Sequence, residues 1–186
     1  MLEYKNASEE FAPQITKLVQ ETIASVYPKY YPKEVVDFFA GLHCADAVRK
    51  DIRNGNIRML LVEGCLAGTG SREGDHITRV YVSPSFQGKG YGTYIIKKLE
   101  EEIFSDYGRI YLDASLPACH LYETLGYKTS YHDKWEVENG VILVYEVMEK
   151  IRPEDIGQER PKKVLEEQSD SGKTETVSYT HLRAHE

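Results

Sequence analysis

The chain has 186 residues, of which 41% are hydrophobic and 28% charged, as in a soluble globular protein of one domain with a sizeable core. The net charge of −7 argues against a nucleic-acid surface, which is usually basic. No apolar run is long enough to span a membrane, and the start, MLEYKNASEEF, is too polar for a signal peptide. Three scattered cysteines, Cys44, Cys65 and Cys119, lack metal-like spacing. We therefore expect reduced thiols, no bound metal and a cytoplasmic location.

The first fifty residues are expected to form one short strand and two helices. Residues 2–5 favour a strand, and apolar side chains recur at helical spacing over 11–26 and 33–42. A rigid aromatic linker, 27–32, joins the two helices, and 45–52 are expected to add a further turn or two.

Strands are expected next over 58–63, 66–72 and 77–82, the last of them buried or half-buried. An amphipathic helix follows a glycine-rich loop. Its buried face is predicted to hold Gly92, Ile95, Ile96, Leu99 and Ile103, and its solvent face Lys97, Lys98, Glu100 and Glu101.

The loop Gln87–Thr93 has the features of a phosphate site. Its alternate glycines lack Cβ atoms, and the first amides of a helix combine free N–H groups with the positive end of the helix dipole. No Gly-Lys-Ser/Thr ends the loop, so it is not a P-loop, and the dinucleotide pattern G-x-G-x-x-G is absent.

A second strand, 109–113, turns through 114–117 into a short helix. Counted from Ala118, this helix carries apolar residues at i, i+3, i+4 and i+7, and Gly126 stands at the expected C-terminal cap. Two further strands, 128–132 and 141–148, complete the sheet around an Asn-Gly hairpin turn at 139–140.

Two motifs resemble signatures of the GNAT acyltransferase superfamily. Gln87, Gly90 and Gly92 match Gln/Arg-x-x-Gly-x-Gly/Ala after a strand, and ACHLYETLGYK at 118–128 is similar to Ala-x-x-x-Tyr-Glu-x-x-Gly-Phe/Tyr. The family often has Asn where this chain has Ser115. The resemblance covers most of 58–150 and implies an α/β fold: a mixed, mostly antiparallel central sheet flanked by helices. A splayed parallel strand pair would form the acyl-coenzyme A cleft.

The resemblance also implies the donor site. The loop amides would bind the pyrophosphate of acetyl-coenzyme A, and the edge of the preceding strand would pair with its pantetheine arm. The residues implied to bind this cosubstrate are Tyr81, Val82, Gln87, Gly88, Lys89, Gly90, Tyr91, Gly92, Thr93, Ser115, Ala118 and Tyr122.

For catalysis, the resemblance places Tyr122 beside the cosubstrate sulfur as general acid; the alternative is an ordinary core tyrosine. His76 lies close to the position of the family's carboxylate base, but a solvated strand-end histidine or a water chain explains the sequence equally well. A backbone N–H at the Tyr81–Val82 edge would stabilise the oxyanion. For Cys119, a structural thiol is favoured over an acyl-cysteine nucleophile.

The favoured function is N-acetyl transfer from acetyl-coenzyme A to a primary amine of a small molecule or an exposed protein amine, within a ternary complex. A non-catalytic acyl-coenzyme A sensor and a nucleotide-phosphate binder are the alternatives. We expect no nucleic-acid or membrane partner, and a monomer or homodimer. Five aromatic residues are candidates for an acceptor wall, although packing is favoured for them: Tyr27, Tyr30, Tyr31, Phe38 and Trp135.

The acetyltransferase domain is expected to span residues 1–152. Residues 153–176 are polar and predicted to be disordered. The last ten residues, 177–186, look like translated sequencing adapter and are interpreted as non-native.

Overall fold

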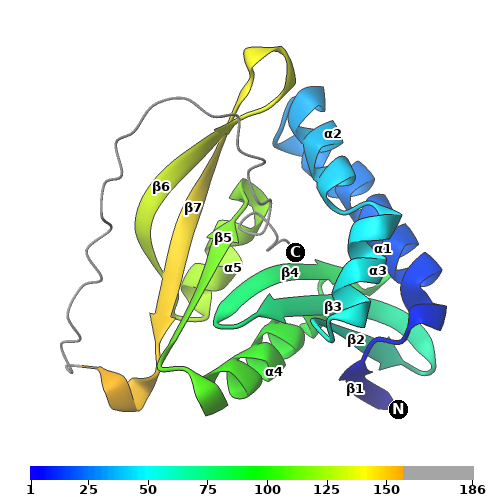
Figure 1. The fold of residues 1–186 in the computed structure, drawn as a ribbon, viewed down its shortest axis with the longest axis vertical. Helices are drawn as coiled ribbons and strands as arrows, with labels where there is room; N and C mark the ends of the chain where they lie inside the picture. Colours follow the sequence, from blue (N-terminus) through cyan, green and yellow to red (C-terminus); the bar gives the residue numbers. More distant parts are fainter. Residues whose placement is uncertain (157–186) are drawn as a thin grey trace.

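A seven-stranded sheet in the order β1-β2-β3-β4-β5-β7-β6 runs through the computed structural model, which describes residues 1–156 (Figure 1). Every neighbouring pair is antiparallel except β4 and β5. The predicted mixed, mostly antiparallel fold class is therefore confirmed. The strands are β1 (Leu2–Asn6), β2 (Ile57–Val62), β3 (Cys65–Glu73), β4 (His76–Val82), β5 (Arg109–Ala114), β6 (Lys128–Glu136) and β7 (Ile142–Ile151).

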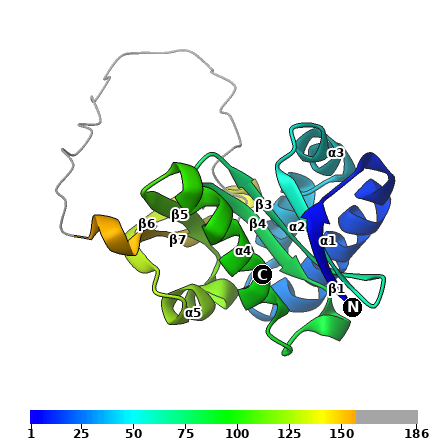
Figure 2. The ribbon, with the colours of Figure 1, turned by 90° about the horizontal axis from the view of Figure 1, so that it is seen from below.

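Helices cover the two faces of the sheet (Figure 2). On one side lie α1 (Ala12–Val26), α2 (Lys33–Leu42) and α3 (Ala45–Arg53); on the other lie α4 (Tyr91–Asp106) and α5 (Leu116–Thr124). The segment predicted as a further turn or two is a separate nine-residue helix, α3. It forms because its buried Val48 and Ile52 join the core beneath α1.

β4 and β5 form only two residue pairs, which join the first two residues of β4 to the middle of β5: His76 with Tyr111 and Ile77 with Leu112. The register between β3 and β4 shifts just beyond this point, where β4 holds one extra residue, Thr78. Such a bulge increases the local twist of a strand. The C-terminal half of β4 therefore diverges from β5, as the family resemblance implied.

The predicted buried face of α4 is confirmed, since Ile95, Ile96, Leu99 and Ile103 are all fully buried. The prediction that Glu100 faces water was wrong: its side chain is buried beside β7. Lys150 Nζ donates to its carboxylate at 2.8 Å. The burial is tolerated because the charge is paired there.

The β6–β7 hairpin turns as the Asn-Gly pair predicted. Asn139 (φ 59°) and Gly140 (φ 71°) both occupy the left-handed region that a type I′ turn requires. β6 continues to Glu136, four residues beyond its predicted end. Its side chains are nearly all exposed, so backbone pairing with β7 forms this strand rather than an apolar pattern. At the hairpin tip, Asn139 Nδ2 donates to Glu34 of α2 at 3.5 Å.

The predicted domain boundary at residue 152 lies just before a short 3-10 helix, Pro153–Asp155. Arg152 Nε donates to Asp155 at 2.9 Å across this turn. The remainder of the predicted polar tail, 157–176, and the suspected adapter segment, 177–186, lie outside the described residues. No helix within residues 1–156 has the length and apolarity needed to cross a lipid bilayer.

Replacing Gly70 of β3 by alanine should destabilise the protein by about 1–3 kcal/mol. A Cβ atom there would lie 2.5 Å from Ile95 Cγ2 and 2.9 Å from Leu99 Cδ1 of α4. Gly41→Ala, in α2, is the matched control because its Cβ would meet no atom within 4 Å. That variant should gain roughly 0.5–1 kcal/mol. Urea denaturation compares the two; equal effects would show that α4 does not pack this closely on β3.

Candidate active site

A cavity of about 350 Å³ opens where the C-terminal ends of β4 and β5 have diverged. Its wall combines the end of α1, the end of β4, the glycine loop with the first turn of α4, and one side of α5. The lining residues are Val26, Tyr30, Val82, Phe86, Gln87, Gly88, Gly90, Tyr91, Gly92, Thr93, Pro117 and Leu121.

The loop backbone is shaped for an anion. Gly88 (φ 72°) and Gly90 (φ 82°) lie in the left-handed region, and a Cβ at either position would meet only open space. Gly90 is also the N-cap of α4, and no side chain in the described part of the chain caps this helix. The amides of the first helical turn are therefore left for a ligand, at the positive end of a 16-residue helix.

The structure brings seven of the predicted cofactor-binding residues to this cavity: Val82, Gln87, Gly88, Gly90, Tyr91, Gly92 and Thr93. Gln87 also holds the loop against the strand, because its Nε2 donates to the carbonyl oxygen of Val82 at 3.0 Å. Five predicted residues do not line the cavity: Tyr81, Lys89, Ser115, Ala118 and Tyr122.

Each of these five has a local reason for its position. Lys89 folds back over the turn before the loop, with Nζ 3.2 Å from the carbonyl oxygen of Ser85 and 5.2 Å from the Phe86 ring centroid. The side chains of Tyr81, Ser115, Ala118 and Tyr122 are fully buried. In place of Ala118 and Tyr122, α5 presents Pro117 and Leu121, four residues apart on one helical face.

Tyr122, the predicted general acid, lies in the core between the sheet and the helices α4 and α5. Its ring packs edge-on against Tyr127, with centroids 5.5 Å apart. Leu121, its neighbour on α5, lines the cavity. Tyr122 is thus adjacent in sequence to a residue of the cavity wall but does not line the cavity itself. Its catalytic role remains a prediction.

Cys119 has the properties of a structural thiol. Its Sγ donates to the carbonyl oxygen of Ser115 at 3.3 Å. Burial, and then the negative charge of Glu146, raise the pKa of Cys119 to about 12. A thiol that stays protonated at neutral pH is a weak nucleophile, which argues against an acyl-cysteine intermediate.

His76, the predicted base, lies where β4 and β5 are still paired, rather than at the cavity. We call this paired region the closed end of the splay. Val82 lies six residue steps further along β4, about 20 Å of extended chain. His76 is 4% exposed and Asp113 is 5% exposed, and Nε2 of the histidine lies 3.3 Å from Oδ2 of the aspartate. Tyr111 stacks on the imidazole at 4.8 Å. Within residues 1–156, no three His, Cys, Asp or Glu side chains are grouped closely enough to hold a metal ion.

A tyrosine bridge, formed by Tyr27, Tyr31 and Tyr81, connects the two arms of the splay. The hydroxyls of Tyr27 and Tyr81 lie 3.4 Å apart, which ties β4 to the end of α1. Tyr31 Oη accepts a hydrogen bond from the first amide of α5, that of Leu116, at 2.7 Å, and both Tyr27 and Tyr31 contact Ser115. Burial raises the pKa of Tyr31 to about 12, so this hydroxyl stays neutral.

The structure gives the positions of the five aromatic residues that were candidates for an acceptor wall. Tyr27 and Tyr31 are core residues, as favoured from the sequence, whereas Tyr30 is 53% exposed and lines the cavity. Phe38 and Trp135 stack on each other, with ring centroids 6.4 Å apart. No sequence signal indicated that Tyr31 caps α5, because the two segments are 85 residues apart.

A buried ionic cluster behind β4 also escaped the sequence analysis. Arg79 is fully buried, with Nη2 3.1 Å from Asp51 Oδ2 of α3 and 3.4 Å from His43 Nδ1. The His43 ring meets Tyr81 edge-on at 5.4 Å. An arginine inside the apolar strand ITRVYV was the available signal, since a buried charge requires a partner.

A family model described as an acetyltransferase (GNAT) domain matches residues 26–150. The chain belongs to the GNAT acetyltransferase family. It is therefore an acetyltransferase, and the family resemblance found in the sequence is confirmed.

Solved structures of GNAT proteins share this fold at low sequence identity. A GCN5-related N-acetyltransferase from Rhodopseudomonas palustris is 22% identical, with a TM-score of 0.72 over 81% of this chain and 94% of its own. The PaiA N-acetyltransferase of Thermoplasma acidophilum, in complex with coenzyme A, is 15% identical, with a TM-score of 0.64 over 81% and 99%. A ribosomal-protein-alanine N-acetyltransferase from Brucella melitensis is 16% identical, with a TM-score of 0.59 over 80% and 99%. No curated protein sequence matches the chain.

Tyr31→Phe should lower the free energy of unfolding by about 1–3 kcal/mol, because the partly buried Leu116 amide loses the tyrosine hydroxyl as its acceptor. Tyr107→Phe removes a hydroxyl from a tyrosine that is 39% exposed, and should change stability by less than about 0.5 kcal/mol. Chemical denaturation of both variants tests the difference. An unaltered midpoint for Tyr31→Phe would show that the bridge does not hold α5.

Proposed function

We propose that this enzyme transfers an acetyl group from acetyl-coenzyme A to a primary amine of a small molecule or an exposed protein amine. The observation that carries the proposal is the cavity at the open end of the splay, where the uncapped N-terminus of α4 and the left-handed Gly88 and Gly90 meet the free edge of β4. The coenzyme A complex of the Thermoplasma protein, on the same fold, supports this choice of carrier.

Each part of the cavity suits one part of that carrier. The loop amides would bind the diphosphate, for which fixed N–H groups at a helix N-terminus are well matched. Among residues 1–156, β4 has no strand partner on its β5 side beyond Ile77, so its edge is available to the amides of the pantetheine arm. An arm lying along β4 would run from the loop towards His76 and Asp113, at the closed end of the splay.

The reaction is direct transfer in a ternary complex. The amine nitrogen attacks the thioester carbonyl carbon, forming the C–N bond, and the C–S bond breaks as the tetrahedral intermediate collapses. A backbone N–H at the Tyr81–Val82 edge would stabilise the oxyanion. The excess amine proton passes to His76, directly or through water, and Tyr122 protonates the departing thiolate. The neutral thiol of Cys119 favours this route over a covalent intermediate.

A non-catalytic acyl-coenzyme A sensor is the alternative. The full burial of Tyr122 is the observation that favours it, because the proposed acid does not line the cavity. The two functions share the donor site and differ only in turnover.

Tyr122→Phe should lower kcat about 10²-fold while leaving the Kd for coenzyme A unchanged. Tyr127→Phe is the matched control, since it removes a buried hydroxyl from the adjacent ring in the same core. It should lower stability but keep kcat. Thiol release is followed with a panel of primary amines. If the wild-type protein binds coenzyme A yet releases thiol with none of them, the sensor function replaces the enzymatic one.

Gly90→Ala should weaken coenzyme A binding at least about tenfold, because the new methyl group would lie against the bound diphosphate. Gly140→Ala is its control: the two glycines have φ of 82° and 71° and open space where a Cβ would lie, but Gly140 lies in the β6–β7 turn. Both variants should lose about 1–2 kcal/mol of stability from backbone strain. Titration calorimetry separates the two effects. Equal coenzyme A affinity in the two variants would exclude the loop as the phosphate site.

A further inference from the structure

One face of the β5–β7–β6 half-sheet carries Asp113 and Asp133 beside tyrosine rings, together with the ion-paired Glu149 and Arg109. Asp113 of β5 is in register with Val147 of β7, which is in register with Tyr131 of β6. One step further along β6, Asp133 pairs with Tyr145. Because side chains alternate along a strand, these residues and Tyr111 share one face. We call the set Tyr111, Asp113, Tyr131, Asp133 and Tyr145 the acidic face.

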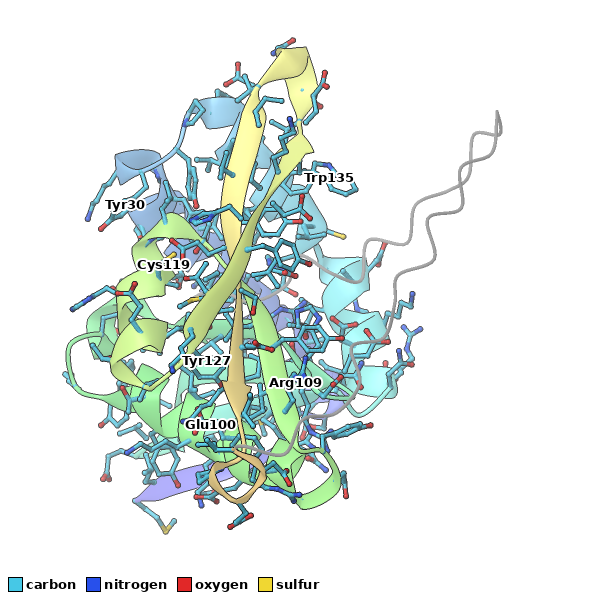
Figure 3. The ribbon with its side chains drawn as sticks, turned by 90° about the vertical axis from the view of Figure 1, so that its left-hand side faces the viewer. Tyr30, Glu100, Arg109, Cys119, Tyr127 and Trp135 are labelled. Carbon is cyan, nitrogen blue, oxygen red and sulfur yellow. The ribbon has the colours of Figure 1, made fainter. Side chains whose placement is uncertain are left out.

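The acidic face lies opposite α5, on the side of the N-terminal helices. Leu112 and Met148 belong to the core under α4 and α5, whereas Tyr145 and Val147 belong to the core with α1 and α2. Figure 3 shows Trp135, two residues beyond Asp133, on the opposite side of the β6–β7 ribbon from Cys119 of α5. The face therefore adjoins His76, the proposed base, on the acceptor side of the splay.

No described Lys or Arg neutralises Asp113 or Asp133, although His76 would form an ion pair with Asp113 if its imidazole were protonated. Asp113 Oδ2 is buried and accepts no hydrogen bond from a described residue, although His76 Nε2 lies 3.3 Å away. Asp133 is exposed and accepts hydrogen bonds from the Tyr145 hydroxyl at 3.1 Å and its neighbour's amide, Lys134 N–H, at 2.8 Å. Neither carboxylate forms an ion pair with a described Lys or Arg, whereas nearby Glu149 is paired with Arg109.

Both carboxylates affect the pKa of the same two tyrosines. Burial raises the pKa of Tyr131 and Tyr145, and the charges of Asp133 and Asp113 raise each pKa further. The Cα atoms of the two aspartates are about 12 Å apart, from two strand spacings across the sheet and two residues along it. Carboxylates between aromatic rings suit alkylammonium groups, which bind negative charge and the faces of such rings.

We propose that the acidic face binds an aliphatic diamine or polyamine as the acetyl acceptor. The reacting amine would lie at His76 and Asp113 and lose its proton to the imidazole. A second ammonium group would bind Asp133, whose carboxylate the Tyr145 hydroxyl orients. This inference rests on the proposed function and specifies its acceptor.

The test compares cadaverine and spermidine with pentylamine, measured by thiol release from acetyl-coenzyme A. Wild-type kcat/KM should be at least about tenfold higher for the two charged acceptors than for pentylamine. Asp133→Asn, at an exposed position that leaves the core intact, should remove most of this preference by raising KM for cadaverine and spermidine. Asp46→Asn, on an α3 side chain that is 94% exposed, controls for the loss of one negative charge and should retain the preference.

The outcomes separate the inference from the proposed function. Equal kcat/KM for cadaverine and pentylamine, or an equal loss for both in Asp133→Asn, overturns the acidic face as the acceptor site while N-acetyl transfer stands. If wild-type protein releases no thiol with any amine, the proposed function fails together with the inference.

Discussion

The site depends on the loss of pairing between β4 and β5 after only two residue pairs. A continuous parallel ladder would fill the space between the strands with backbone hydrogen bonds, and no ligand could enter the sheet. The extra residue in β4, Thr78, turns the strand away at this point. Among residues 1–156, the edge of β4 beyond this point has no strand partner on its β5 side, although the Val82 carbonyl oxygen accepts a hydrogen bond from Gln87. The loop that follows places the N-terminus of α4 at the same opening.

Divergent strands lose hydrogen bonds, so other contacts must fix their separation. The tyrosine bridge does this across the opening, since Tyr81 belongs to one arm and Leu116, bound by Tyr31, begins the helix on the other. Behind β4, the buried pair of Arg79 and Asp51 fixes α3 against the strand. Removing one partner of such a pair typically costs about 3–5 kcal/mol, because the other charge is left buried. The N-terminal helices thus hold the two diverging strands at a fixed separation.

The two proposed substrate sites have opposite electrostatic character. At the cavity, backbone amides and a helix dipole favour an anion. On the acidic face, Asp113 and Asp133 favour a cation. Under the two proposals, a phosphorylated donor would bind at the glycine loop and a positively charged acceptor at the acidic face, with His76 near the point where the strands meet.

Local signals determined the elements: the period of apolar residues located α4, the Asn-Gly pair fixed the hairpin turn, and the alternate glycines marked the cavity loop. These are properties of residues close together in the chain, and a sequence displays them directly. Tertiary structure alone decided that Tyr31 caps α5, that Arg79 meets Asp51, and that Glu100 is buried against Lys150. Partners 28 to 85 residues apart leave no periodic trace, because their meeting depends on how the strands are ordered in the sheet.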